Sequence, residues 1–132
     1  MEFLRRLFKG KKTILVADDE PGLLETTVLA LQHKGYRVLK AANGSDAFAI
    51  ALSVKPDLIV LDIRMPGMDG WDVLGAVRSS KVLKATPVLM LTTVNQTGDI
   101  NKSFEMGASD YIIKPLDAGK LYRKVEALIG LP

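Results

Sequence analysis

The stretch Leu58–Gly70, LIVLDIRMPGMDG, decides the fold. Its first four residues are apolar, and they run directly into Asp62. A continuous apolar run of this length is typical of a strand that is buried on both faces of a parallel sheet. Pro66, Gly67 and Gly70 then end the strand and favour a loop. Because ligands of open α/β sheets bind beyond the carboxyl ends of the strands, Asp62 stands where such a fold would place a reactive carboxylate.

The composition is that of one soluble globular domain, which is also what 132 residues predict. The chain has no cysteine, which excludes a disulfide framework and a thiolate metal site. No apolar run approaches the roughly 20 residues of a membrane span, and the first 12 residues lack the apolar stretch of a signal peptide. We therefore expect a cytoplasmic protein.

The net charge of +3 comes from one end of the chain. The segment Met1–Lys12 carries five basic residues and one acidic residue, whereas the remainder carries 13 basic and 14 acidic residues. The basic character is therefore a short tail and not a surface spread over the domain. Direct binding to nucleic acid is not expected from this distribution.

Strand-like and helix-like segments alternate five times along the chain. The apolar runs predict strands at Thr13–Ala17, Arg37–Ala41, Leu58–Leu61, Pro87–Leu91 and Tyr111–Ile113. Helices are predicted from Pro21 to a stop at Gly35, from an N-cap at Ser45 to about Leu52, over Trp71–Ser79, over Asp99–Met106, and after a cap at Asp117. This alternation predicts a five-stranded parallel sheet with right-handed crossovers and helices on both faces.

Polar side chains stand at the carboxyl ends of four predicted strands: Asp18 and Asp19, Asp62, Thr92, and Lys114. All of them would meet at one edge of the sheet. Carboxylates that lie close together repel one another unless a cation joins them, and an all-oxygen cluster of this kind suits Mg²⁺. A lysine and a hydroxyl group would bind phosphate oxygens. A carboxylate can also form an aspartyl-phosphate as the nucleophile, so the pattern predicts a Mg²⁺-assisted phosphoryl acceptor.

Each of these residues has an ordinary structural explanation when it is taken alone. Asp19 would favour a helix N-terminus, Thr92 would end a strand, and Lys114 would be solvated. Their joint placement favours function. The sequence has no G-x-x-x-x-G-K-[ST] or G-x-G-x-x-G motif, and the Asp62-Ile63-Arg64 triplet lacks the second Asp of an aspartate-based phosphatase. The single histidine, His33, is expected at the surface near the end of its helix.

Four blocks of the sequence resemble the receiver domain of two-component response regulators, of the single-domain, chemotaxis-regulator type. These blocks are Asp18-Asp19-Glu20-Pro21, Leu61–Gly70, Leu91-Thr92-Thr93 and Asp110–Pro115. The match covers roughly Lys12 to Ile129, so residues 13–132 are predicted to be the receiver and residues 1–12 an N-terminal extension. The resemblance implies a flavodoxin-like, doubly wound sheet with strand order 2-1-3-4-5 and five helices.

The resemblance also implies a role for each matching residue. Asp62 would accept a phosphoryl group from the phosphohistidine of a histidine kinase. Asp18, Asp19, Asp62 and the backbone carbonyl of Arg64 would bind Mg²⁺.

The remaining matched residues would act on the phosphoryl group or report its presence. Thr92 and Lys114 would contact the phosphoryl group, and Thr92 and Tyr111 would form the switch. The Lys114–Pro115 bond would be cis. Arg64 and Val94 would flank the path of the attacking water.

Several interpretations remain open. The chain is expected to be a phosphorylation switch that binds a partner protein through the predicted helix Asp99–Met106, strand Tyr111–Ile113 and last helix. It would then be a phosphoacceptor and not an enzyme. The alternatives are a phosphorelay intermediate, the receiver of a longer regulator, or, less favoured, an aspartyl-phosphate enzyme that acts on a small substrate. Its partners would be a histidine kinase or phosphotransfer protein and an unidentified output protein.

The segment Met1–Lys12 lies outside the family pattern. Its apolar residues Phe3, Leu4, Leu7 and Phe8 have helical spacing, with basic residues between them. Such a helix would pack on the receiver, bind a partner protein or lie on an anionic membrane surface, and of these, protein contact is favoured. The alternative is a solvated tail.

Overall fold

Five parallel strands pair in the order β2-β1-β3-β4-β5 in the computed structural model, which describes residues 11–93 and 97–132. The strands are β1 (Thr13–Ala17), β2 (Arg37–Ala41), β3 (Leu58–Asp62), β4 (Val88–Thr92) and β5 (Asp110–Ile113). The helices are α2 (Pro21–Lys34), α3 (Gly44–Val54), α4 (Gly70–Ser79), α5 (Thr97–Glu105) and α6 (Ala118–Ile129). This is the predicted flavodoxin-like, doubly wound fold, and the strand order is the expected one.

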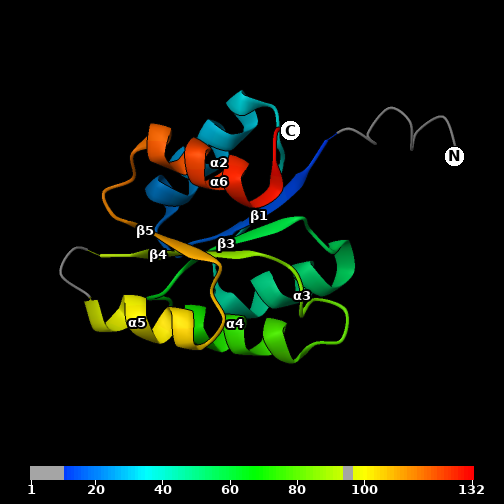
Figure 1. Cartoon of the computed structure of the whole chain (residues 1–132), viewed down its shortest axis with the longest axis vertical. Coiled ribbons are helices and arrows are strands. Elements are labelled where there is room, and N and C mark those ends of the chain that lie inside the picture. Colours follow the sequence, from blue (N-terminus) through cyan, green and yellow to red (C-terminus); the bar gives the residue numbers. More distant parts are fainter. Residues whose placement is uncertain (1–10, 94–96) are drawn as a thin grey trace, which may run out of the picture.

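The sheet forms the middle of three layers (Figure 1). Helices α2 and α6 cover one face, and α3, α4 and α5 cover the other. On β3, Leu58 and Val60 pack with residues of α2 and α6, whereas Ile59 and Leu61 pack with residues of α3 and α4. Side chains alternate across a strand, so only a run that is apolar throughout can bury both faces. Each such side chain contributes about 1.5–3 kcal/mol when it is fully buried.

The helix ends follow local chemistry, with one correction to the predicted caps. Gly35 ends α2 in the left-handed conformation, and the side chain of Asp117 caps α6 by accepting from Gly119, both as expected. The N-cap of α3 is Asn43 and not Ser45, because the Asn43 side chain accepts a hydrogen bond from the backbone N–H of Asp46. An amide oxygen caps as well as a hydroxyl group, so sequence preference alone did not separate the two candidates.

Other predicted boundaries differ from the structure by one or two residues. Helix α3 extends to Val54, and β4 includes Thr92, which the prediction placed just after the strand. Helix α5 begins at Thr97 and not at Asp99. Among the residues that the structure describes, none of the helices has the length and apolar character needed to cross a bilayer. The predictions for residues 1–10 and for Val94 lie outside the described residues.

Two glycines allow the loop after β3 to pack closely against its neighbours. A Cβ atom on Gly70 would lie 2.4 Å from the carbonyl oxygen of Asp62, and one on Gly44 would lie 2.1 Å from the carbonyl oxygen of Met68. Both contacts are with backbone, which cannot move aside as a flexible side chain can. The backbone N–H of Gly70 also donates to the carbonyl of Ile63 at 2.9 Å. Glycine at these two positions therefore fixes the loop that follows Asp62.

We predict that Gly70→Ala lowers the free energy of unfolding by about 2 kcal/mol or more, because the new methyl group forces the backbone after Asp62 to move. Gly22→Ala is the matched control: Gly22 is also in the first turn of a helix, but its Cβ position is open. The control should be neutral or stabilising by up to about 1 kcal/mol. Urea unfolding of the two variants measures this difference, and equal effects would contradict it.

Candidate functional site

The register of the sheet brings the predicted site residues to one edge. Ala17 lies beside Leu61, and Asp62 lies beside Leu91, so the residues that end β1, β3 and β4 are level with one another. The backbone N–H of Lys114 donates to the carbonyl of Thr92 at 2.7 Å, which extends the pairing one residue beyond β5. The structure therefore gathers the side chains that follow four of the five strands.

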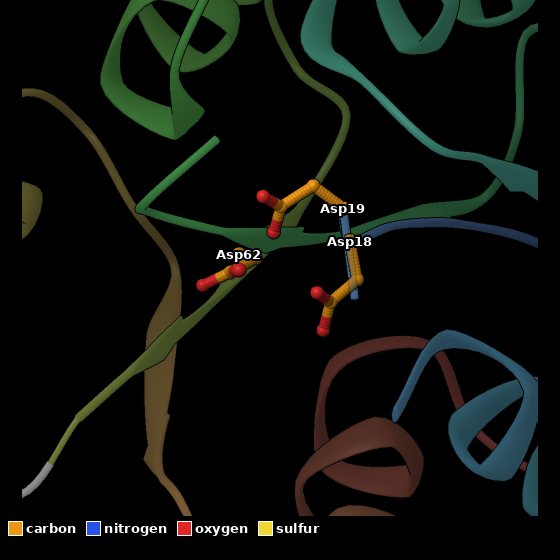
Figure 2. Close-up of side chains that lie close together, drawn as sticks. All are labelled: Asp18, Asp19 and Asp62. Atoms are coloured by element: carbon orange, nitrogen blue, oxygen red, sulfur yellow. The ribbon is translucent and has the colours of Figure 1, made fainter. Parts of the chain in front are cut away.

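Three carboxylates lie at this edge. Oxygen atoms of Asp18, Asp19 and Asp62 all lie within 4.8 Å of one another. Figure 2 shows Asp18 and Asp19 next to each other after the blue strand β1 and Asp62 beside them. Asp18 and Asp62 are buried, and Asp19 is exposed. Such a set of oxygen ligands, with one side open to solvent, fits a hard cation that retains some of its water.

Lys114 supplies the positive charge within this cluster. Its Nζ lies 3.1 Å from Oδ1 of Asp62 and 3.6 Å from Oδ2 of Asp18. Lys114 directly follows strand β5, and the peptide bond between Lys114 and Pro115 is cis. One ammonium group thus faces two buried carboxylates, and three carboxylates with one ammonium group carry a formal charge of −2.

Two buried oxygen atoms of the cluster have no hydrogen-bond partner among the described residues. They are Oδ2 of Asp18 and Oγ1 of Thr92. Buried polar atoms are normally satisfied, because leaving one unpaired costs about 1–3 kcal/mol. The Asp18 oxygen suits a cation, and the Thr92 hydroxyl suits an oxyanion or water. The residues present therefore fit a divalent metal ion together with an oxygen-rich group.

Burial raises the pKa of Asp62 from its ordinary 3.8 to about 6. The positive charge of Lys114 opposes this effect, while the negative charge of Asp18 adds to it. Hydrogen bonds from the Lys114 side chain and the Arg64 backbone also lower the pKa, but they do not restore the ordinary value. A bound cation would favour the ionised form, so metal binding and the charge of Asp62 are coupled.

The other predicted residues lie as follows. Tyr111 is in β5, partly buried, with its ring edge against Phe104 of α5 at a centroid distance of 5.8 Å. His33 is exposed in the last turn of α2, as expected. Arg64 lies in the loop directly after Ile63, which follows β3.

A second group of contacts beside the site was missed by sequence reasoning. The side chain of Arg64 forms an ion pair with Asp99 of α5 and lies over the ring of Trp71 of α4. Asp99 lies 35 positions after Arg64 in the sequence, and Trp71 lies seven positions after it. No local pattern predicts the contact, because it depends on how α4 and α5 pack.

Comparison with known proteins identifies the same fold. The family model described as "Response regulator receiver domain" matches residues 14–126. The chain is 37% identical over 116 residues to the DNA-binding dual master transcriptional regulator RpaA of Synechocystis, covering 88% of this chain and 48% of RpaA. The chain spans about half the length of the first curated relatives that it matches.

Two further similarities cover nearly the whole of the matched protein. Protein PilH of Pseudomonas aeruginosa is 35% identical over 117 residues, which are 89% of this chain and 97% of PilH. The receiver domain of the sensor histidine kinase PA1611 from the same species is 29% identical, with a TM-score of 0.85, and the match covers 92% of this chain and 99% of that structure. That structure has a magnesium ion coordinated in its active site cleft.

We predict that without metal the ionisation of Asp62 destabilises the folded protein. Because the folded-state pKa is raised, this carboxyl group keeps its proton to higher pH in the folded than in the unfolded state, and stability falls as pH rises from about 4 through about 6. In EDTA, Asp62→Asn should therefore be more stable than the parent at pH 8, by about 2–3 kcal/mol. At pH 4 the difference should fall below about 1 kcal/mol.

Urea unfolding at the two pH values measures this difference. Glu105→Gln, which removes an exposed carboxylate outside the site, is the control for the loss of one negative charge. An Asp62→Asn variant that is no more stable than the parent at pH 8 would contradict the raised pKa.

Proposed function

The chain belongs to the response regulator receiver family, and on this basis we propose that it is a phosphorylation switch whose acceptor is Asp62. The observation that supports this best is the placement of Asp62 itself. It is a buried carboxylate with the ammonium group of Lys114 at 3.1 Å and two further carboxylates close enough to share a cation. The donor would be the phosphohistidine of a histidine kinase or phosphotransfer protein.

In the transfer step, a carboxylate oxygen of Asp62 attacks the phosphorus atom of the phosphohistidine. A new O–P bond forms as the P–N bond breaks, and the bonding electron pair returns to the imidazole nitrogen. Lys114 would hold one phosphoryl oxygen by charge, and the Thr92 hydroxyl would donate to another. Two observations support these roles: Nζ of Lys114 lies 3.1 Å from Asp62, and the buried hydroxyl of Thr92 has no hydrogen-bond partner among the described residues.

Mg²⁺ is the cofactor that this donor set suits. Asp18, Asp19, Asp62 and the backbone carbonyl of Arg64 would hold it. When bound, the ion offsets the negative charge of the carboxylates and of the arriving phosphoryl oxygens. It would also lower the pKa of Asp62, so that the nucleophile is ionised at neutral pH.

The output of the switch would be a change on the surface of α5, β5 and α6. Phosphorylation adds charge and acceptor oxygens beside Thr92. Thr92 would turn toward them, and Tyr111 would take up the space that this leaves. Such a change shifts the balance between two conformations and does not create a new fold. An unidentified output protein would read the altered surface.

A phosphoacceptor explains the site better than an enzyme that turns over a small substrate. Histidine is the side chain that most often transfers protons in such enzymes. The single histidine, His33, is in the last turn of α2, a helix that begins beside the carboxyl end of β1 and runs for 14 residues. At 1.5 Å per residue, this places His33 about 20 Å from the start of that helix.

The wider role follows from the same proposal. A receiver that receives its phosphate from a histidine kinase would work in the cytoplasm and would pass its signal to a protein and not directly to nucleic acid. A phosphorelay intermediate or the receiver part of a longer regulator would use the same acceptor.

We predict that the parent incorporates phosphate from acetyl phosphate or a histidine kinase when Mg²⁺ is present, and that EDTA prevents this. Asp62→Asn should abolish the alkali-labile label, because it removes the nucleophilic oxygen. Glu105→Gln should incorporate label normally, since this exposed residue lies outside the site. Radiolabelling of the three proteins tests the proposal, and undiminished labelling of Asp62→Asn would overturn it.

We also propose that residues 13–132 act as the receiver without residues 1–12. The described core is built from residues between Ile14 and Ile129, and it covers both faces of the sheet. Deleting residues 1–10 should change the thermal unfolding midpoint by less than about 2 °C and leave Asp62 labelling intact. It should instead reduce binding to a partner protein or to anionic vesicles, which cosedimentation measures. Unfolding of the deletion variant would show that the segment is structural.

A further inference from the structure

The side chain of Arg64 connects the loop after the acceptor to helix α5. Its Nη2 atom lies 2.7 Å from Oδ2 of Asp99, in the first turn of α5. The Arg64 side chain is 60% exposed, whereas that of Asp99 is 13% exposed. The carboxylate is therefore held in a sheltered position, whereas most of the Arg64 side chain faces solvent.

Trp71 of α4 contacts both Arg64 and helix α5. Arg64 lies over its ring with the guanidinium carbon 5.2 Å from the ring centroid, and the ammonium group of Lys102 lies 3.9 Å from the same ring. The indole Nε1 donates to Oγ of Ser103 at 3.1 Å, and that hydroxyl donates to the carbonyl of Asp99 at 2.7 Å. A continuous set of polar contacts thus joins the first turn of α4 to the first two turns of α5.

These contacts link the first two turns of α5 to its neighbours in the described part of the chain. Ser103, a polar residue, is the side chain of α5 that is buried there. Ile100, in the first turn, is half-buried, and the ring of Phe104 contacts Tyr111 at the end of the second turn. A salt bridge and hydrogen bonds therefore help to hold the first turn in position, and such contacts exchange partners at lower cost than a packed core.

We propose that Asp99 and the phosphoryl group on Asp62 compete for the guanidinium group of Arg64, so that phosphorylation releases the first turn of α5. Arg64 is two residues from Asp62, and a guanidinium group prefers the paired oxygens of a phosphate to a single carboxylate oxygen. Asp99 is a positioning residue in this arrangement, because it acts on the acceptor site through Arg64. The inference rests on the proposed phosphorylation of Asp62.

Competition for Arg64 also means that Asp99 weakens the binding of a phosphoryl group at Asp62. If the phosphoryl group weakens the Arg64–Asp99 pair, then removing the charge of Asp99 must strengthen binding of a phosphoryl mimic by the same factor. A partly exposed ion pair sets this factor at about 2- to 5-fold. In a variant that lacks the charge of Asp99, the first turn of α5 should also resemble that of the phosphorylated parent, even without phosphate.

The test is a titration of the full chain with beryllofluoride and Mg²⁺, followed by the emission of Trp71, the single tryptophan. Asp99→Asn should bind about 2- to 5-fold more tightly than the parent, and the amide signals of the first turn of α5 should already be shifted before beryllofluoride is added. Glu105→Gln removes the same charge from the opposite end of α5 and should bind as the parent does.

A double-mutant cycle with Arg64→Gln separates competition from a general charge effect. In the Arg64→Gln background, Asp99→Asn should no longer tighten binding. Binding of Asp99→Asn that is equal to or weaker than that of the parent would overturn the inference, and so would equal tightening in both backgrounds. If the parent itself fails to bind beryllofluoride with Mg²⁺, the proposed function is wrong as well.

Discussion

The ammonium group of Lys114, between the carboxylates of Asp62 and Asp18, is the interaction on which the charge balance of the site depends. Two carboxylates buried side by side without it would repel each other at high energetic cost. With it, the three carboxylates and the ammonium group still carry a formal charge of −2, which a divalent cation would neutralise. Burial raises the pKa of Asp62 to about 6, and the negative charge of Asp18 adds to this effect, although the positive charge of Lys114 opposes it. The site therefore favours the binding of a cation, and the folded protein is less stable when no metal is bound.

The rest of the fold provides the rigidity that such a site requires. The central strands β1, β3 and β4 are buried along their length, and their register holds Asp62 level with the end of β4. Gly44 and Gly70 then allow the following loop to lie against α3 and β3 without a side chain between them. A destabilising cluster of like charges is tolerable at the sheet edge because the apolar layers on both faces supply the stability elsewhere.

Much of this arrangement was predictable, because it follows from local patterns. The apolar run Leu58–Leu61 predicted a doubly buried strand, and alternation with helices predicted a parallel sheet that brings Asp18, Asp62 and Lys114 together. The choice of Asn43 over Ser45 as a helix cap was not predictable from residue type, since both side chains suit the position. The Arg64–Asp99 pair was not predictable either, because it exists only once α4 and α5 are packed side by side.

Helix α5 differs from α4 in the way it is attached, and this difference determines which of them can move. Helix α4 buries Val73, Leu74 and Val77 against the sheet, and displacing it would expose apolar surface that is worth several kcal/mol. The start of α5 is held through Asp99 by polar contacts with the largely exposed Arg64 side chain, which water can replace at little net cost. A change of charge near Asp62 is small compared with the energy of the core, but it is comparable to the energy of these contacts. The signal should therefore pass through α5 and leave α4 in place.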